Sequence, residues 1–299
     1  MGCFWSRPLS PLGALVGRLS ESLGLTALSL ASACAQAEAL GLRGTFSLVV
    51  AIDFTRSNEH NGERTFARAS LHAIADEGGG AGTRENHYEA VIASLAPLQA
   101  LRARALGRGP GPAPGQQPAP EPEAEPILVY GFGDAETRDA RVFDFMTPLD
   151  RAPTSVRDVV ARYREIAPSV VLSGPTTYVH AIAKAAARVE ESERACVLVL
   201  VCDDPPQRYR ETLEALVCAS RLALYVVCVG VGDAPFVQLA QLAQDAAQSC
   251  AFANFAFVHY TSETRVRDEA AWRARVGARV VASVAHMARA AKEAQVKFA

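Results

Sequence analysis

Short apolar runs alternate with amphipathic stretches from residue 46 to residue 260. The runs at 46–52 and 196–202 are continuous and rich in β-branched residues, which is typical of strands buried on both faces of a sheet. Between such runs, apolar residues recur every three or four positions, and this spacing predicts helices. The alternation predicts an α/β fold: an open, mostly parallel, doubly wound sheet between two layers of helices.

The same pattern gives approximate bounds for each element. Strands are expected at 46–52, 127–132, 141–145, 196–202, 222–229 and 255–260. Helices are expected at 87–106, 155–166, 178–189, 208–220 and 236–247. The run at 141–145 follows the preceding strand closely, so we expect a hairpin there and one antiparallel strand in the sheet.

Residues 107–126 depart from this pattern, because eleven of these twenty positions are Gly or Pro. Such a segment has too little apolar surface to pack, and we expect a disordered surface insert. Residues 263–299 depart in the opposite sense and predict a basic C-terminal helix. Its apolar positions at helical spacing are Trp272, Val276, Val280, Val284 and Met287. We expect this helix to lie on the sheet with a solvated basic face; the alternative is a basic amphipathic helix that meets anionic lipid.

Length and charge refine this organisation. The 299 residues suggest about two domains. Setting aside a leader at 1–44, the insert and the C-terminal helix leaves about 200 residues, so one domain at 45–262 is expected. The formal net charge of −2 argues against nucleic acid as a partner. The oligomeric state is left open by the sequence.

The N-terminus matches a lipidation pattern. Residues 1–6 fit the signal for myristoylation of Gly2, and Cys3 is placed for palmitoylation beside it. Two acyl chains hold a membrane durably whereas one does so only marginally. No uninterrupted apolar run long enough for a transmembrane helix follows. We therefore expect a cytoplasmic protein, peripheral at the inner face of a membrane; an ordinary unmodified start is the alternative.

Oxygen-bearing side chains follow three elements of the predicted sheet. Asp53, Thr55 and Ser57 come after the first strand, Thr176 begins a helix, and Asp203 and Asp204 follow the strand at 196–202. Ligands of open α/β sheets bind at the carboxyl ends of the strands, so we expect these side chains to converge there. Carboxylates and hydroxyls suit a hard divalent cation, above all Mg²⁺.

Several other motifs are incomplete. Residues 131–134 and 230–233 both spell Gly-x-Gly-Asp without the remainder of a phosphate loop, so we expect strand ends that turn sharply. The six His residues share no metal-ligand spacing, and no Cys-x-x-Cys pair occurs among the seven Cys. Most of the Cys lie in apolar runs, which favours a reducing, intracellular setting.

The ordered series of motifs resembles the copine family and its von Willebrand factor A-like domain. It is similar above all to the copine-like domain of plant RING ubiquitin ligases. The strings that carry the resemblance span about 45–262 and are found at 50–58, 131–134, 162–166, 173–178, 219–222, 229–233 and 255–258.

The resemblance implies a metal-ion-dependent adhesion site at one edge of the sheet. Its five positions are filled by Asp53, Thr55, Ser57, Thr176 and Asp203. The implied metal is Mg²⁺, or Mn²⁺ or Ca²⁺ in its place, and the implied partner is a protein that offers an acidic residue. Asp204 stands where the family usually has Gly, which raises the local negative charge.

The modules of these relatives are expected to be missing. About 45 residues precede the domain, too few for the two C2 domains of copines. No Cys follows Cys250, so the Cys/His set of a RING does not exist and ligase activity is not expected.

The expected function is therefore a membrane-associated, non-catalytic protein-binding module without a catalytic residue. One alternative is a Mg²⁺-dependent phosphohydrolase that uses Asp53 and Asp203. Another is a scaffold that recruits substrates for a separate ubiquitin ligase.

Overall fold

A computed structural model describes residues 35, 46–74, 85–105, 125–145, 152–260 and 269–299. Its centre is a six-stranded sheet in the order β3-β2-β1-β4-β5-β6. The strands are β1 (Ser47–Asp53), β2 (Ile127–Phe132), β3 (Phe143–Asp144), β4 (Cys196–Cys202), β5 (Leu224–Gly230) and β6 (Phe255–His259). Only the β2–β3 pair is antiparallel. The expected fold class, including its single antiparallel strand, is confirmed.

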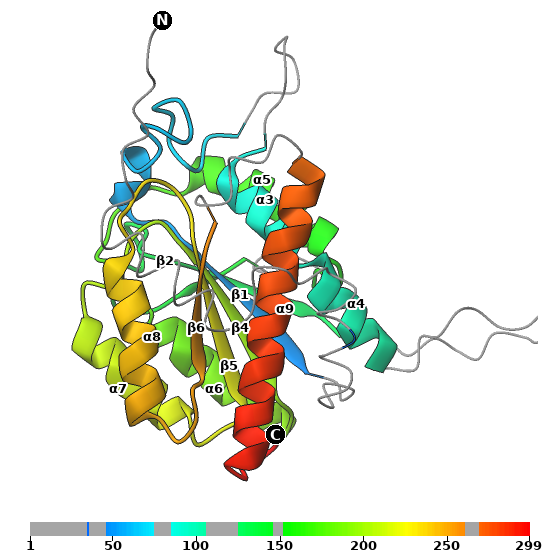
Figure 1. Ribbon diagram of the computed structural model, residues 1–299. Helices are drawn as coiled ribbons and strands as arrows, with labels where there is room; N and C mark the ends of the chain where they lie inside the picture. Colours follow the sequence, from blue (N-terminus) through cyan, green and yellow to red (C-terminus); the bar gives the residue numbers. More distant parts are fainter. Residues whose placement is uncertain (1–34, 36–45, 75–84, 106–124, 146–151, 261–268) are drawn as a thin grey trace, which may run out of the picture.

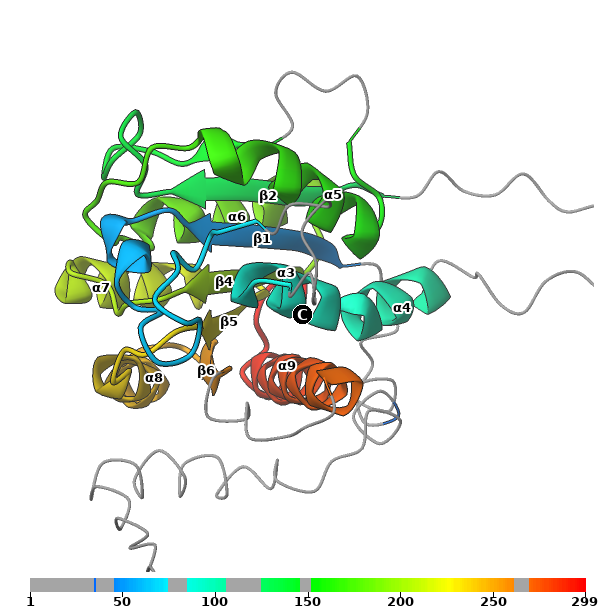
Figure 2. The ribbon, with the colours of Figure 1, turned by 90° about the horizontal axis from the view of Figure 1, so that it is seen from above.

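Two helical layers enclose the sheet (Figures 1 and 2). One layer holds α6 (Val179–Ser192), α7 (Tyr209–Ala219) and α8 (Val237–Ser249). The other holds α3 (His87–Ser94), α4 (Ala96–Ala105), α5 (Val156–Ile166) and α9 (Glu269–Glu293). Alternate residues of β1 enter two separate cores, with Leu48 and Val50 in one and Val49 and Ala51 in the other. Every residue of β1, β4 and β5 is buried, which explains their unbroken apolar sequence.

One predicted helix is wrong in its length. The stretch expected as a single helix at 87–106 forms α3 and α4, separated at Leu95. Pro97 lies at the start of α4, where a missing N–H is tolerated. In one continuous helix its ring would meet the carbonyl of residue 93, so the chain restarts instead.

The C-terminal helix packs as expected. Trp272, Val276, Val280, Val284 and Met287 are all buried, and α9 contacts β5, β6, α3 and α4. None of the helices in the described part of the chain is long and apolar enough to span a bilayer. The leader at 1–44 apart from residue 35, and almost all of the insert at 107–126, lie outside the described residues, as do Gly2 and Cys3. The predictions for them stay predictions.

Two short 3-10 helices were not expected from the sequence. They are η2 (Arg56–Glu59), directly after β1, and η3 (Ala167–Ser169), directly after α5. Both lie at the edge of the sheet where the candidate ligands are found.

Candidate functional site

The two candidate carboxylates lie at the ends of neighbouring strands, because β1 and β4 pair in parallel. Asp53 is the last residue of β1, and Asp203 directly follows β4. Both side chains are fully buried. Since charged side chains are rarely buried without partners, their surroundings decide what they do.

The segment after β1 turns back over the end of its own strand. The backbone N–H of Thr55 donates to Oδ1 of Asp53 at 2.8 Å. The hydroxyls of Thr55 and Ser57 are 2.9 Å apart, within hydrogen-bond distance. These two contacts join the three alternate positions Asp53, Thr55 and Ser57.

Asp203 is held by side chains from the same segment. Its Oδ1 accepts hydrogen bonds from Oγ of Ser57 at 3.0 Å and from Nδ2 of Asn58 at 3.1 Å. Its Oδ2 accepts from Nδ2 of Asn61 at 3.0 Å. These donors fix the orientation of the Asp203 carboxyl group.

Thr176 arrives from the loop between η3 and α6. Ser173 anchors this loop on the β1 segment, because its carbonyl accepts from the N–H of Arg56 at 2.7 Å. The hydroxyl of Thr176, which is buried, donates to the hydroxyl of Thr55 at 3.4 Å. The structure therefore brings together all five side chains that the sequence indicated.

The chemistry of the cluster suits a bound cation. Oδ2 of Asp53 is buried and has no hydrogen-bond partner. Burial, with a contribution from the nearby Asp204 carboxylate, raises the pKa of Asp53 to about 7. Burial and the charges of Asp53 and Asp204 likewise raise the pKa of Asp203. A divalent cation would supply the partner that Oδ2 lacks and would favour both ionised carboxylates.

The donor set fits Mg²⁺ better than a transition metal. The described residues hold no cluster of three or more His, Cys, Asp or Glu side chains suited to a metal ion. The candidate centre instead combines two carboxylates with three hydroxyls, which are all hard oxygen donors. Asp204 adds charge beside it: burial raises the pKa of its carboxyl group, and its carbonyl accepts from the Tyr178 hydroxyl at 2.6 Å.

A buried polar network beneath the site was missed in the sequence. Nε2 of His72 is 2.7 Å from the carbonyl oxygen of Asp53, and Nδ1 is 2.7 Å from the hydroxyl of Tyr163. The ring of His72 is stacked between Phe54 and Tyr88. Burial lowers the pKa of His72 to about 3, so the ring is neutral. This arrangement matches a His72 that donates to Asp53 and accepts from Tyr163.

Asn58 links the carboxylate of Asp203 to Tyr88, which stacks on His72. Its Nδ2 also donates to the carbonyl of Thr55 at 3.0 Å, and its Oδ1 accepts from the hydroxyl of Tyr88 at 2.6 Å. Asn58 directly follows the Asp-x-Thr-x-Ser string, and this position was the sequence signal that could have indicated its role in the site. Nothing in the spacing of His72, Tyr88 and Tyr163 connects them to Asp53.

The two Gly-x-Gly-Asp strings form turns that pack against the candidate site. Gly133 and Gly232 adopt φ of +80° and +87°, as sharp turns at strand ends require. A Cβ at Gly133 would lie 2.3 Å from Cγ2 of Thr55, and one at Gly232 would lie 2.6 Å from the carbonyl oxygen of Asn61. Both turns thus pack closely against the segment that carries the candidate ligands.

A family model described as Copine matches residues 120–297 of the chain. The E3 ubiquitin-protein ligase RGLG1 of Arabidopsis thaliana is 36% identical over 239 residues, which cover 75% of this chain and 43% of that protein. Copine family protein 1 of Caenorhabditis elegans is 31% identical over 249 residues, which cover 81% of this chain and 20% of that protein. The chain thus spans less than half the length of these relatives.

Solved structures are more distant. A von Willebrand factor type A protein from Catenulispora acidiphila aligns with a TM-score of 0.42 and 14% identity, over 81% of this chain and 43% of that one. The manganese-loaded TRAP protein of Plasmodium vivax aligns with a TM-score of 0.42 and 12% identity, over 74% of this chain and 70% of that one.

Proposed function

The chain belongs to the copine family, and on this premise we propose that it is a non-catalytic protein-binding module whose divalent-cation site engages an acidic side chain of a partner. The observation that carries the proposal is the buried Oδ2 of Asp53, which has no hydrogen-bond partner in the midst of other oxygen donors. A buried, unpaired carboxylate oxygen is costly unless a cation meets it.

The residues divide into ligands and supports. Asp53, Thr55, Ser57, Thr176 and Asp203 would hold Mg²⁺, with Mn²⁺ or Ca²⁺ as substitutes. When bound, the cation offers a positive charge and an open position to a partner's carboxylate. Asn58 and Asn61 hold the carboxyl group of Asp203 in place, which preserves the donor set before any metal arrives.

Membrane attachment is a separate part of the proposal. Acylation at Gly2 and Cys3 would keep the module at the inner face of a membrane and in the cytoplasm. The partner would then be met at that surface. The sequence pattern at residues 1–6 is its support.

Calorimetry with Mg²⁺ and Mn²⁺ tests the metal centre directly. The unmodified chain should bind one equivalent of Mg²⁺, and Asp53→Ala should abolish the binding heat while circular dichroism shows an intact fold. Asp233→Asn is the matched control: Asp233 lies at the same edge of the sheet, where its carboxylate caps the N–H of Arg64. Equal Mg²⁺ binding by Asp53→Ala would contradict the proposal.

Affinity capture tests the partner and the membrane. Capture should be compared in Mg²⁺ and in chelator, with the unmodified chain, Asp53→Ala and Gly2→Ala. We expect chelator and Asp53→Ala to remove the same proteins, and Gly2→Ala to move the chain from the membrane fraction to the soluble one. Capture that is unchanged in chelator would refute a metal-dependent partner.

A further inference from the structure

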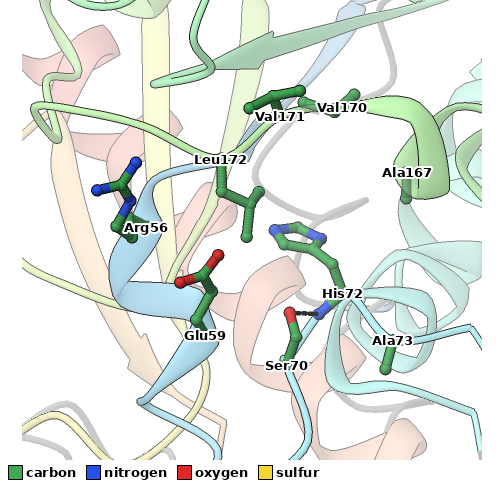
Figure 3. A pocket seen from close by; sticks show the side chains of 9 residues that line it. All are labelled: Arg56, Glu59, Ser70, His72, Ala73, Ala167, Val170, Val171 and Leu172. Atoms are coloured by element: carbon green, nitrogen blue, oxygen red, sulfur yellow. Dashed lines mark hydrogen bonds between the residues drawn. The ribbon is translucent and has the colours of Figure 1, made fainter.

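A cavity of about 420 Å³ opens beside the candidate metal centre. Figure 3 shows its walls, which come from η2, from residues 70–73, from the start of η3 and from the loop after η3. The same segments build the site: Arg56 lies between Thr55 and Ser57, and Leu172 precedes Ser173, which bridges to Thr55. A ligand at the metal centre would therefore have this cavity as its neighbour.

The inner wall is aliphatic. Leu172, Val170 and Ala167 line it. His72 also lines the cavity, and both of its ring nitrogens are already within hydrogen-bond distance of Asp53 and Tyr163. At the rim, Val171 is 67% exposed and is the large apolar side chain most open to solvent in the described part of the chain.

One carboxylate faces this aliphatic space. In Figure 3 the carboxylate of Glu59 points toward the gap between Leu172 and His72, whereas the guanidinium of Arg56 points away from it. No ion pair or hydrogen bond engages the Glu59 side chain among the described residues. The cavity thus combines an aliphatic wall with an unpaired negative charge at its mouth.

We propose that this cavity receives a lysine or arginine side chain of the partner protein, with its aliphatic stem against Leu172 and Val170 and its cationic end on Glu59. Long basic side chains bury their methylene groups on apolar surface and keep the charge at the edge, as this shape and charge require. The inference rests on the proposed function for one point: the basic residue would belong to the partner whose acidic residue meets the metal. The recognised element would then be a basic and an acidic side chain close together on one surface.

Nuclear magnetic resonance with a single-residue probe tests the cavity by itself. N-acetyl-lysine N-methylamide, titrated in chelator, should shift the backbone amides of Ser70, His72, Val171 and Leu172 in a saturable way. The N-acetyl-norleucine analogue has the same stem without the charge and should bind about fivefold more weakly, the effect of one solvent-exposed ion pair.

Two variants locate the charge. Glu59→Gln should reduce the affinity for the lysine probe about fivefold, to that of the norleucine analogue. Glu63→Gln is the matched control, because Glu63 is exposed on the same segment and does not line the cavity. It should leave the affinity unchanged. No saturable shift, equal binding of the two probes, or a Glu59→Gln variant that binds like the unmodified chain would each overturn the inference.

The outcome is separable from that of the metal centre. The lysine probe carries no side-chain carboxylate and is titrated without metal, so its binding does not depend on Asp53. Probe binding in a chain that fails to bind Mg²⁺ would refute the proposed function alone. Mg²⁺ binding in a chain that ignores the probe would refute the basic-side-chain pocket alone.

Discussion

At the scale of single residues, the candidate site places two carboxyl groups close together in a buried cluster. Oδ1 of Asp53 accepts one backbone hydrogen bond, whereas Oδ2 has no partner. Asp203, by contrast, is surrounded by donors from Ser57, Asn58 and Asn61. The sequence predicted which oxygens meet, since motif positions sit at strand ends. It could not predict Asn61 or His72, because their roles depend on how the segment folds back over β1.

The first prediction concerns the pH dependence of stability in chelator. The folded-state pKa of Asp53 is raised from 3.8 to about 7, so its contribution to stability is fully present below pH 3.8 and is lost as pH rises through 7. The free energy of unfolding of Asp53→Asn minus that of the unmodified chain should therefore increase between about pH 4 and pH 8, by a few kcal/mol. Urea denaturation of both chains checks this, and titration of His72 cancels in the difference. A difference that is flat across this range would refute the raised pKa.

The second prediction concerns Asp204, which directly follows Asp203. Burial raises the pKa of Asp53 and Asp203 most, and the charge of Asp204 raises both further, so Asp204 should also attract a cation. Asp204→Asn should weaken Mg²⁺ binding about fivefold, a typical effect of one nearby partly screened charge. Asp204→Gly in the same calorimetric measurement separates charge from backbone. If Asp204→Asn binds as tightly as the unmodified chain while Asp204→Gly does not, the backbone rather than the charge matters.

At the scale of elements, the turns after β2 and β5 hold the ligand segment from outside. The string Gly-x-Gly-Asp predicted a sharp turn at each strand end, and the positive φ of Gly133 and Gly232 confirms it. What the turn touches was beyond the sequence, since the contact with Thr55 joins elements far apart in the chain. The break between α3 and α4 was not predicted, although Pro97 is visible in the sequence. The apolar residues on both sides of it keep helical spacing, so the pattern indicated one continuous helix.

The third prediction tests the turn after β2. Gly133→Ala places a Cβ 2.3 Å from Cγ2 of Thr55 at a positive φ, and should destabilise the chain by about 2 kcal/mol and weaken Mg²⁺ binding. Thr55→Ser keeps the hydroxyl ligand and removes the obstructing methyl group. The double variant should recover part of the lost stability, so the two changes couple by about 1 kcal/mol in thermal unfolding. Strict additivity would show that only the backbone strain at Gly133 is felt.

At the scale of the whole molecule, α9 completes the core on one face of the sheet. Predicting this needed only the spacing of its apolar residues, all of which are buried. The same spacing fits a membrane-surface helix, and the sequence left that alternative open. Burial of the apolar face against β5 and β6 removes the surface with which such a helix would enter a bilayer.

The fourth prediction follows from that burial. Val280→Ala removes two methyl groups at a fully buried position and should lower the free energy of unfolding by about 2 kcal/mol, with one cooperative transition retained. His286→Ala, at an exposed position of the same helix, should have little effect. Chemical denaturation followed by far-ultraviolet circular dichroism makes the comparison. A separate early transition in Val280→Ala would show that α9 unfolds apart from the sheet.

The hydrogen bond between Ser57 and Asp203 spans 146 positions of the chain. Such a long loop closes only after β1 and β4 have paired, so the complete donor set is absent from early, locally folded states. A cation that needs the complete set stabilises the native state and leaves the folding transition state almost unaffected. Saturating Mg²⁺ should therefore slow unfolding while the folding rate stays nearly constant, and the metal would set how long the folded chain lasts rather than how fast it forms.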